Sequence, residues 1–304
     1  QPTQPRTTPL SHIKTTALSY THSRSPKLPI SYMLWRPEND NFKTRNILTT
    51  ANADGEIQNW HLTSGKCIST FKDDSTNTTD KQLYCIDYNN DGTKIISCGS
   101  EPVLRVYDEI KRKKALDLSE PNAPHNCHTN RVYCVKFNRD PELQHIVYSG
   151  GWDQTLVVWD LRVGKPVQNI FGPYICGDGI ANCGMDLLTA SWRQNDQLQQ
   201  WDARKCELNE TLDWDGLKVS SVPCFLYSCQ FSKKNKDMII AGGSNSNEVK
   251  LFDKSNNNKP FCVIHNLPRE ISTVDFSHDD ELFVISGADG FVRVFSVAEI
   301  LDKN

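Results

Sequence analysis

Short runs of alternating apolar and polar residues fill most of this chain. Segments such as VYCVKF, HIVYSG and LVVW are apolar at every second position or throughout, which is typical of β-strands. The runs break at Asn, Asp, Gly and Lys, as turns do. No stretch keeps a helical period over any length. The pattern therefore predicts an all-β protein built from many short strands.

Strands that end in an aromatic residue followed by a polar one recur along the chain. The aromatics are spaced by about 40 to 50 residues, a period that suits four short strands and their turns. The pairs are Trp60-His61, Tyr107-Asp108, Trp159-Asp160, Trp201-Asp202, Phe252-Asp253 and Phe295-Ser296. A unit of this size cannot bury both of its faces alone, so the units are expected to stack around a ring.

These six units resemble the WD-repeat family of β-propellers, over nearly the whole chain from residue 13 to residue 297. The best match is CHTNRVYCVKF followed by SGGWDQTLVVWD. The resemblance implies a single propeller of four-stranded antiparallel blades. It also implies a buried hydrogen-bonded chain made of His128, Ser149, Asp153 and Trp159. These partners belong to strands and turns, so a structural role is favoured over a hydrolase triad of the same residue types.

Other units keep only part of this pattern. Asp54 precedes Trp60, and Asp289 precedes Phe295, so we expect these three positions, Asp54, Trp60 and Asp289, to serve the architecture of their own blades. The last unit stops after its third strand. The resemblance implies that residues 13–20 complete it, which closes the ring and removes an exposed sheet edge.

The domain organisation follows from this closure. Residues 1–12 are expected to be a disordered tail and residues 13–304 to be one propeller. Six blades are visible in the sequence. Seven remain an alternative, if residues upstream of Gln1 contribute three strands and residues 13–20 the fourth.

The composition mainly excludes classes of function. Of 304 residues, 38% are hydrophobic and 23% charged, and the net charge is −3, so no global positive field draws nucleic acid to the chain. No apolar run reaches the ~18 residues of a membrane span. The eleven cysteines contain no CxxC pair, which indicates reduced, buried thiols of a cytoplasmic protein. We expect no metal, cofactor, membrane contact or small-molecule substrate.

Two tryptophans occupy positions where the repeat does not require one. Trp152 and Trp192 fall at matching places in neighbouring units, next to loops of the same face. Tyr174, Asp178 and Arg193 lie close enough in the sequence to join them. Aromatic residues and Arg are typical anchors of protein interfaces, so these five residues are the predicted binding site. Packing of both tryptophans beneath the loops is the alternative.

The sequence favours a non-catalytic scaffold that binds other proteins within a multiprotein assembly. A cytoplasmic setting is expected, with a cytoskeletal or ciliary role by analogy with other proteins of the family. In one alternative, WDLR and WDAR resemble the WDxR signature of substrate receptors of cullin-type ubiquitin ligases, and Arg162 and Arg204 contact the adaptor. The other, an enzyme with its site in the central channel, lacks any catalytic motif in its favour.

Overall fold

The structure is a computed structural model that describes residues 29–39, 42, 44–72, 81–120 and 123–302. The described residues form six antiparallel sheets with almost no helix, which confirms the predicted all-β propeller. Five sheets have four strands each, and the sixth has three among the described residues. The expected tail, residues 1–12, and the expected closing strand, residues 13–20, lie outside the described part of the chain.

Each sheet is one blade, and its strands follow one another in sequence order. Blades 1 to 3 comprise β1 (Ile30–Trp35), β2 (Ile47–Asn52), β3 (Glu56–His61) and β4 (Lys66–Lys72); β5 (Leu83–Tyr88), β6 (Lys94–Gly99), β7 (Leu104–Asp108) and β8 (Lys113–Leu118); and β9 (Val132–Phe137), β10 (Ile146–Gly151), β11 (Thr155–Asp160) and β12 (Lys165–Phe171). Blades 4 to 6 comprise β13 (Ile180–Cys183), β14 (Asp186–Ala190), β15 (Leu198–Asp202) and β16 (Leu208–Thr211); β17 (Cys224–Phe231), β18 (Met238–Asn245), β19 (Val249–Asp253) and β20 (Lys259–Ile264); and β21 (Ile271–Phe276), β22 (Leu282–Gly287) and β23 (Val292–Ser296).

Helical segments are short in the described part of the chain. Three 3-10 turns there cover Pro124–Asn126, Trp214–Leu217 and Lys254–Asn256, and the five-residue helix α1 (Val297–Leu301) follows β23. Among the described residues, none of these helices has the length and apolar character needed to cross a membrane.

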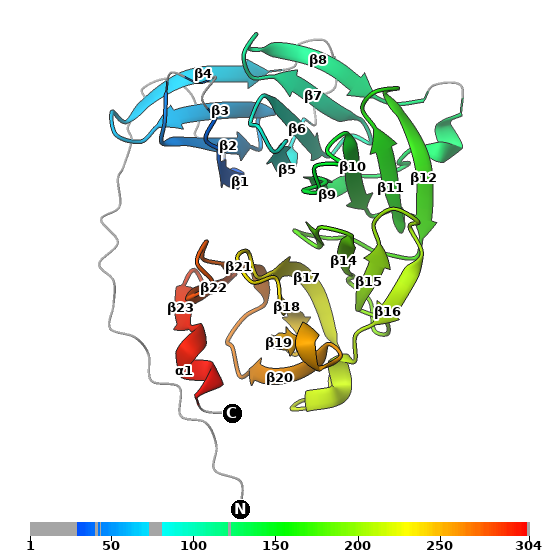
Figure 1. Ribbon diagram of the computed structural model, residues 1–304, viewed down its shortest axis with the longest axis vertical. Coiled ribbons are helices and arrows are strands. Elements are labelled where there is room, and N and C mark those ends of the chain that lie inside the picture. Colours follow the sequence, from blue (N-terminus) through cyan, green and yellow to red (C-terminus); the bar gives the residue numbers. More distant parts are fainter. Residues whose placement is uncertain (1–28, 40–41, 43, 73–80, 121–122, 303–304) are drawn as a thin grey trace, which may run out of the picture.

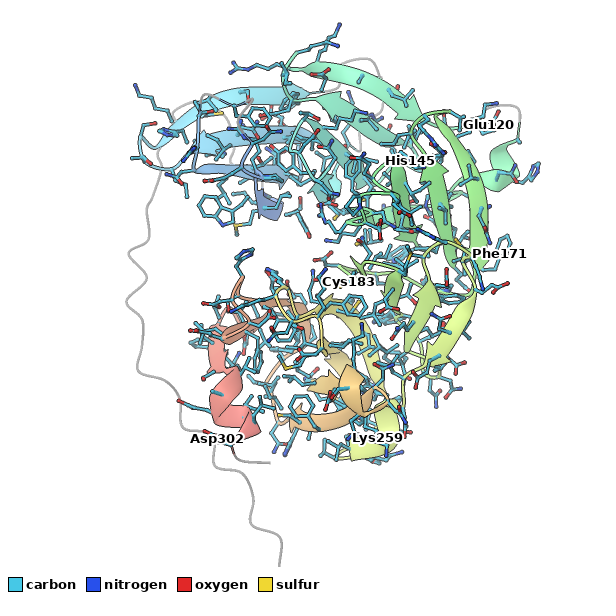
Figure 2. All side chains as sticks on the ribbon, in the orientation of Figure 1. Glu120, His145, Phe171, Cys183, Lys259 and Asp302 are labelled. Carbon is cyan, nitrogen blue, oxygen red and sulfur yellow. The ribbon has the colours of Figure 1, made fainter. Side chains whose placement is uncertain are left out.

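The blades are arranged around a centre, with the first strand of each blade innermost (Figure 1). These inner strands touch in the order β1, β5, β9, β13, β17 and β21. Side chains fill the space between neighbouring sheets, whereas Phe171 at the end of the outer strand β12 points away from the ring (Figure 2). The core is therefore a series of layers between blades.

The repeated aromatics lie in these layers. Trp159 and Phe252 are fully buried, and the ring of Tyr107 in blade 2 packs 5.5 Å from that of Phe71 in blade 1. In all five four-stranded blades, the pairing of the third and fourth strands shifts register beside the aromatic residue. Such a bulge bends the strand and re-aims its side chains. The period in the sequence thus corresponds to one bulge in each four-stranded blade, beside an aromatic residue that is buried in blades 2 to 5 and partly exposed in blade 1.

The first and last blades are covered on one face only. Every residue of β11, in the middle of the arc, is buried. In contrast, β1 exposes Met33 (62%) and Trp35 (57%), and β23 exposes Val292 (70%). The ribbons of blades 1 and 6 are separated by a gap in Figure 1. Within the described residues, apolar side chains on both sides of this gap are therefore left in solvent.

Candidate protein-binding face

The turns between second and third strands and the links between blades lie on the same face of the ring. Trp152 follows β10 and Trp192 follows β14, so both predicted tryptophans lie on this face in adjacent blades. In blade 3, the residue before Trp152 has to be glycine, because a Cβ at Gly151 would lie 2.1 Å from the carbonyl oxygen of Arg131. The same carbonyl accepts a 3.0 Å hydrogen bond from the backbone N–H of Trp152.

Six aromatic side chains form what we call the aromatic band. It comprises Tyr84, Tyr133, Trp152, Tyr174, Trp192 and Phe225, from blades 2 to 5 and the link between blades 3 and 4. Its members lie in two groups. Both groups retain solvent exposure at their tryptophans, 39% for Trp152 and 36% for Trp192. The band is thus held in place by ring contacts and still accessible to a partner.

Parallel stacking defines the first group. The ring of Tyr84 lies 4.6 Å from that of Tyr133, at an interplanar angle of 12°. Tyr133 in turn stacks on Trp152 with a centroid distance of 5.3 Å. The guanidinium of Arg131 lies 5.7 Å from the Trp152 ring, within cation–π range. Aromatic pairs of this kind contribute about 0.5–1.5 kcal/mol beyond burial of their area, so the stack is a rigid surface.

The second group is centred on Trp192. Its ring lies 4.9 Å from Phe225 and 6.1 Å from Tyr174, the latter edge-on. The backbone joins the two groups: Trp192 N–H donates to the carbonyl of Tyr174 (2.8 Å), and Ile175 N–H donates to that of Gly151 (3.3 Å). The link between blades 3 and 4 therefore fixes the spacing of the two tryptophan turns.

Arg193 borders the second group but is engaged within the chain. Its guanidinium donates to the carbonyl oxygens of Gly172 (3.1 Å) and Asp196 (2.7 Å) and to Oε1 of Gln199 (2.6 Å). It braces the turn that carries Trp192. Its predicted role in direct partner contact remains a prediction.

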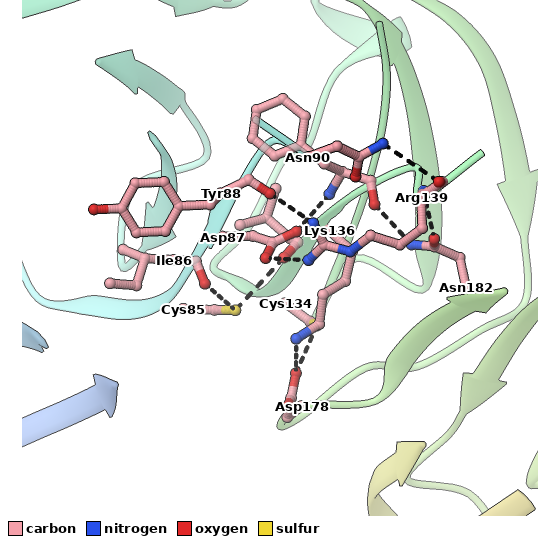
Figure 3. A network of polar contacts seen from close by, with 12 residues as sticks. Cys85, Ile86, Asp87, Tyr88, Asn90, Cys134, Lys136, Arg139, Asp178 and Asn182 are labelled. Atoms are coloured by element: carbon pink, nitrogen blue, oxygen red, sulfur yellow. Dashed lines mark hydrogen bonds and ion pairs between the residues drawn. The ribbon is translucent and has the colours of Figure 1, made fainter. Parts of the chain in front are cut away.

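Asp178 does not join the tryptophans. Its carboxylate lies at the centre of the ring, 2.7 Å from Nζ of Lys136 and 3.0 Å from the hydroxyl of Tyr32 (Figure 3 shows the Lys136 contact). Burial raises the pKa of the Asp178 carboxyl, an effect that the ammonium of Lys136 partly offsets. Burial also raises the pKa of the Tyr32 hydroxyl well above its usual range. A buried carboxylate is stabilised by a nearby opposite charge, and Lys136 on β9 supplies that charge for Asp178.

The WD-type chain of polar residues is present in blade 3. His128 Nδ1 lies 2.7 Å from Asp153, His128 Nε2 lies 2.7 Å from Ser149 Oγ, and Trp159 Nε1 donates to that Oγ at 2.8 Å. Ser149 is completely buried. The Ser149 hydroxyl is therefore bonded to the Trp159 indole, whereas the nucleophilic hydroxyl of a hydrolase must be accessible to a substrate.

The partial units show partial versions of this chain. Trp60 Nε1 donates to Thr50 Oγ1 at 3.1 Å, and Trp201 Nε1 donates to Thr189 Oγ1 at 2.9 Å. Asp54 lies 3.6 Å from Nζ of Lys72. Asp289 instead pairs with Arg293 at 2.6 Å, in a unit whose aromatic, Phe295, has no donor to offer.

The two WDxR arginines lie in turns between third and fourth strands, on the face opposite the aromatic band. Arg162 donates to both carboxylate oxygens of its neighbour Asp160, at 2.6 and 3.1 Å. Arg204 pairs with Glu142 in the preceding blade. Each guanidinium already has a carboxylate partner inside the chain, and adaptor contact by either remains a prediction.

Three residues of the band were not expected from the sequence: Tyr84, Tyr133 and Phe225. A signal for two of them was present, because LYCIDY and VYCVKF carry a tyrosine at the same place in successive repeats. Residues at equivalent positions of adjacent blades are neighbours in a propeller. Lys136 and the buried ion pair it forms with Asp178 had no such signal.

The sequence is similar to known repeat proteins. The family model described as "WD domain, G-beta repeat" matches residues 65–108, 119–160 and 261–296. A serine-threonine kinase receptor-associated protein of Dictyostelium discoideum is 27% identical over 83% of this chain and 76% of its own length. Human pre-mRNA-processing factor 17 is 29% identical over 40% of this chain, an alignment that spans only 19% of the length of that relative. The mRNA export factor GLE2 of Chaetomium thermophilum is 30% identical over 29% of this chain and 22% of its own.

Proposed function

Because the chain belongs to the WD-repeat family of β-propellers, we propose that it is a non-catalytic scaffold that binds other proteins within a larger assembly. The observation that carries this proposal is the aromatic band. Two groups of contacting rings, the first of them stacked, stand on a rigid sheet framework, and their tryptophans are each more than one-third exposed. Pre-ordered Trp and Tyr side chains lose little conformational entropy on binding, which makes them effective interface anchors.

We also propose what kind of assembly this is and in which compartment it lies. Several relatives carry names from RNA biology, namely a pre-mRNA-processing factor and an mRNA export factor. These names support a role in an assembly that handles RNA, with this chain contacting its protein members. The cytoplasmic, cytoskeletal or ciliary setting expected from the sequence is the competing proposal. Fractionation of cells that produce the tagged protein distinguishes them, since an RNA-processing role requires a nuclear fraction.

The decisive experiment compares partner capture by three proteins from the native cell. These are the unmodified chain, Trp152→Ala with Trp192→Ala, and Phe291→Ala, which removes an exposed aromatic from blade 6. Loss of an interface anchor costs roughly 2 kcal/mol or more, about a 30-fold fall in affinity. We expect the double variant to lose its partners and Phe291→Ala to keep them. Full capture by a folded double variant would exclude the aromatic band as the site.

A further inference from the structure

Three potential metal ligands converge where blades 2, 3 and 4 meet at the centre of the ring. Cys85 lies on β5, Cys134 on β9 and Asp178 in the link that precedes β13. One ligand atom from each lies within 4.8 Å of the other two, and Cys134 Sγ is 3.3 Å from Asp178 Oδ1 (Figure 3). Both thiols are almost completely buried. We propose that Cys85, Cys134 and Asp178 form a zinc-binding site that joins three blades.

The donor types and spacing select zinc among common cations. Two thiolates with one carboxylate form a mixed sulfur–oxygen set, which suits Zn²⁺ and is poor for the oxygen-seeking Mg²⁺ and Ca²⁺. Zinc–sulfur bonds of about 2.3 Å and zinc–oxygen bonds of about 2.1 Å place tetrahedral ligands about 3.5–3.8 Å apart. The 3.3 Å Cys134–Asp178 distance is close to that value. The remaining ligand, Cys85, needs at most a small side-chain movement.

A tetrahedral ion with three protein ligands has a fourth position to fill. The Tyr32 hydroxyl lies 3.0 Å from Asp178 Oδ2 and 2.7 Å from Lys136 Nζ. Either this hydroxyl or a water molecule can occupy the position. Because Tyr32 belongs to β1, its participation would tie blade 1 to the same ion.

The ammonium of Lys136 already pairs with Asp178 at 2.7 Å and would repel a metal cation bound to the same carboxylate. The thiol protons released on binding compensate for the added positive charge. If both cysteines are counted as thiols, the metal-free cluster of one ammonium, one carboxylate and two thiols has a total charge of zero. Binding Zn²⁺ forms two zinc–sulfur bonds and releases both thiol protons to water, so the total stays zero. The exchange thus buries no net charge, and Lys136 remains beside the thiolates as a counter-ion.

The test uses the purified full chain, produced in zinc-containing medium and handled under reducing conditions. We expect about one zinc per chain by elemental analysis after dialysis, because both thiolate ligands are buried and zinc–thiolate bonds are strong. Replacing zinc with Co²⁺ is expected to give the thiolate-to-cobalt charge-transfer absorption that sulfur ligation produces. This spectrum needs no variant, so it decides the proposal even where a substitution prevents folding. A folded chain with neither bound zinc nor this absorption overturns the site.

Matched variants assign the ligands. Cys85→Ser, Cys134→Ser and Asp178→Asn each replace an anionic ligand with a weaker neutral one, whereas Cys224→Ser alters a buried cysteine of blade 5 that lies outside the cluster. Loss of a residue that merely supports a ligand typically costs about 10- to 100-fold in metal affinity, so removal of a ligand is expected to cost more than about 100-fold. Cys224→Ser is expected to bind zinc as the unmodified chain does. Undiminished zinc in folded Cys85→Ser and Cys134→Ser, or a Cys85–Cys134 disulfide in the reduced sample, contradicts the proposal.

Discussion

The indole Nε1 of Trp159 donates a 2.8 Å hydrogen bond to the hydroxyl oxygen of Ser149, inside a blade where both residues are completely buried. The same hydroxyl lies 2.7 Å from Nε2 of His128. One oxygen thus satisfies two ring nitrogens that have no access to water. Networks that are satisfied in this way fix one geometry, because breaking any bond leaves a buried polar atom without a partner.

Replacing Ser149 with Ala is expected to lower the free energy of unfolding by about 1–3 kcal/mol, since the indole N–H loses its acceptor in a site without water. Urea denaturation followed by tryptophan fluorescence measures the change. Ser149→Thr keeps the hydroxyl, which blades 1 and 4 already supply from Thr50 and Thr189. We expect it to retain more stability than Ala. The exposed Ser221→Ala is the surface control, and an equal loss in both alanine variants would refute a role for the network.

Asp153 makes this network sensitive to acid. Burial would raise the pKa of its carboxyl, but hydrogen bonds from His128 and from the backbone of Thr129 and Thr155 hold that pKa below the ordinary value of about 3.9. A carboxyl whose pKa is lower in the folded state stabilises the fold above the ordinary pKa. That contribution disappears as the pH falls through the folded-state pKa.

The corresponding prediction compares unfolding of the unmodified chain and Asp153→Asn between about pH 6 and pH 3.5. Near pH 6 we expect the variant to be less stable by about 1.5–3 kcal/mol, because bonds to a charged acceptor are lost. The difference is expected to shrink as the pH falls toward 3.5, because the carboxyl of the unfolded chain, with its ordinary pKa of about 3.9, takes up protons before the native carboxyl does. Asp117→Asn changes an exposed carboxylate and serves as the control for net charge. A stability difference that is constant with pH would assign the effect to packing.

The sequence allowed the architecture to be predicted because the repeat is local. A strand ending in Trp159-Asp160 needs only the preceding strand, with Ser149, and the turn between them to form its hydrogen bonds. The number of visible blades followed from counting such units. Trp152 and Trp192 were identifiable because each departs from the pattern of its neighbours.

Contacts between side chains of different blades could not be predicted, because the sequence of a single repeat does not specify them. No pattern in the sequence indicates that Asp178 turns inward to Lys136, since the two residues are brought together only by the curvature of the ring. The stack of Tyr84 on Tyr133 likewise joins two blades. Cys85 and Cys134 were interpreted as buried apolar residues, because their approach to Asp178 requires three blades to be in place.

The ubiquitin-ligase alternative makes a separate prediction. If the chain is a substrate receptor, Arg162→Ala with Arg204→Ala abolishes co-purification of the cullin adaptor. Both arginine side chains are more than half exposed, and ion pairs of exposed side chains contribute little to folding, so the thermal midpoint should change little. Arg269→Ala, another exposed arginine, should retain whatever adaptor the unmodified chain binds. An unmodified chain that never captures the adaptor removes this alternative.

Closure of the ring is the last prediction. β23 pairs with β22 on one side only among the described residues, and a free strand edge invites aggregation. Residues 13–20 are expected to pair with this edge, and residues 21–29 then form a link comparable in length to residues 172–179, which join blade 3 to blade 4. Such pairing also favours approach of blade 1, where Met33 and Trp35 need a covering surface.

Hydrogen exchange followed by mass spectrometry tests this pairing. We expect slow exchange in residues 13–20, against rapid exchange of the outward-facing amides of β16, the outer strand of blade 4. A truncation pair provides the control: removal of residues 1–12 should leave the thermal midpoint unchanged, while removal of residues 1–20 should lower it and increase aggregation. Unfolded-like exchange in residues 13–20 would instead mean that the arc stays open at β23, and that the exposed apolar faces of blades 1 and 6 are free to receive a seventh blade.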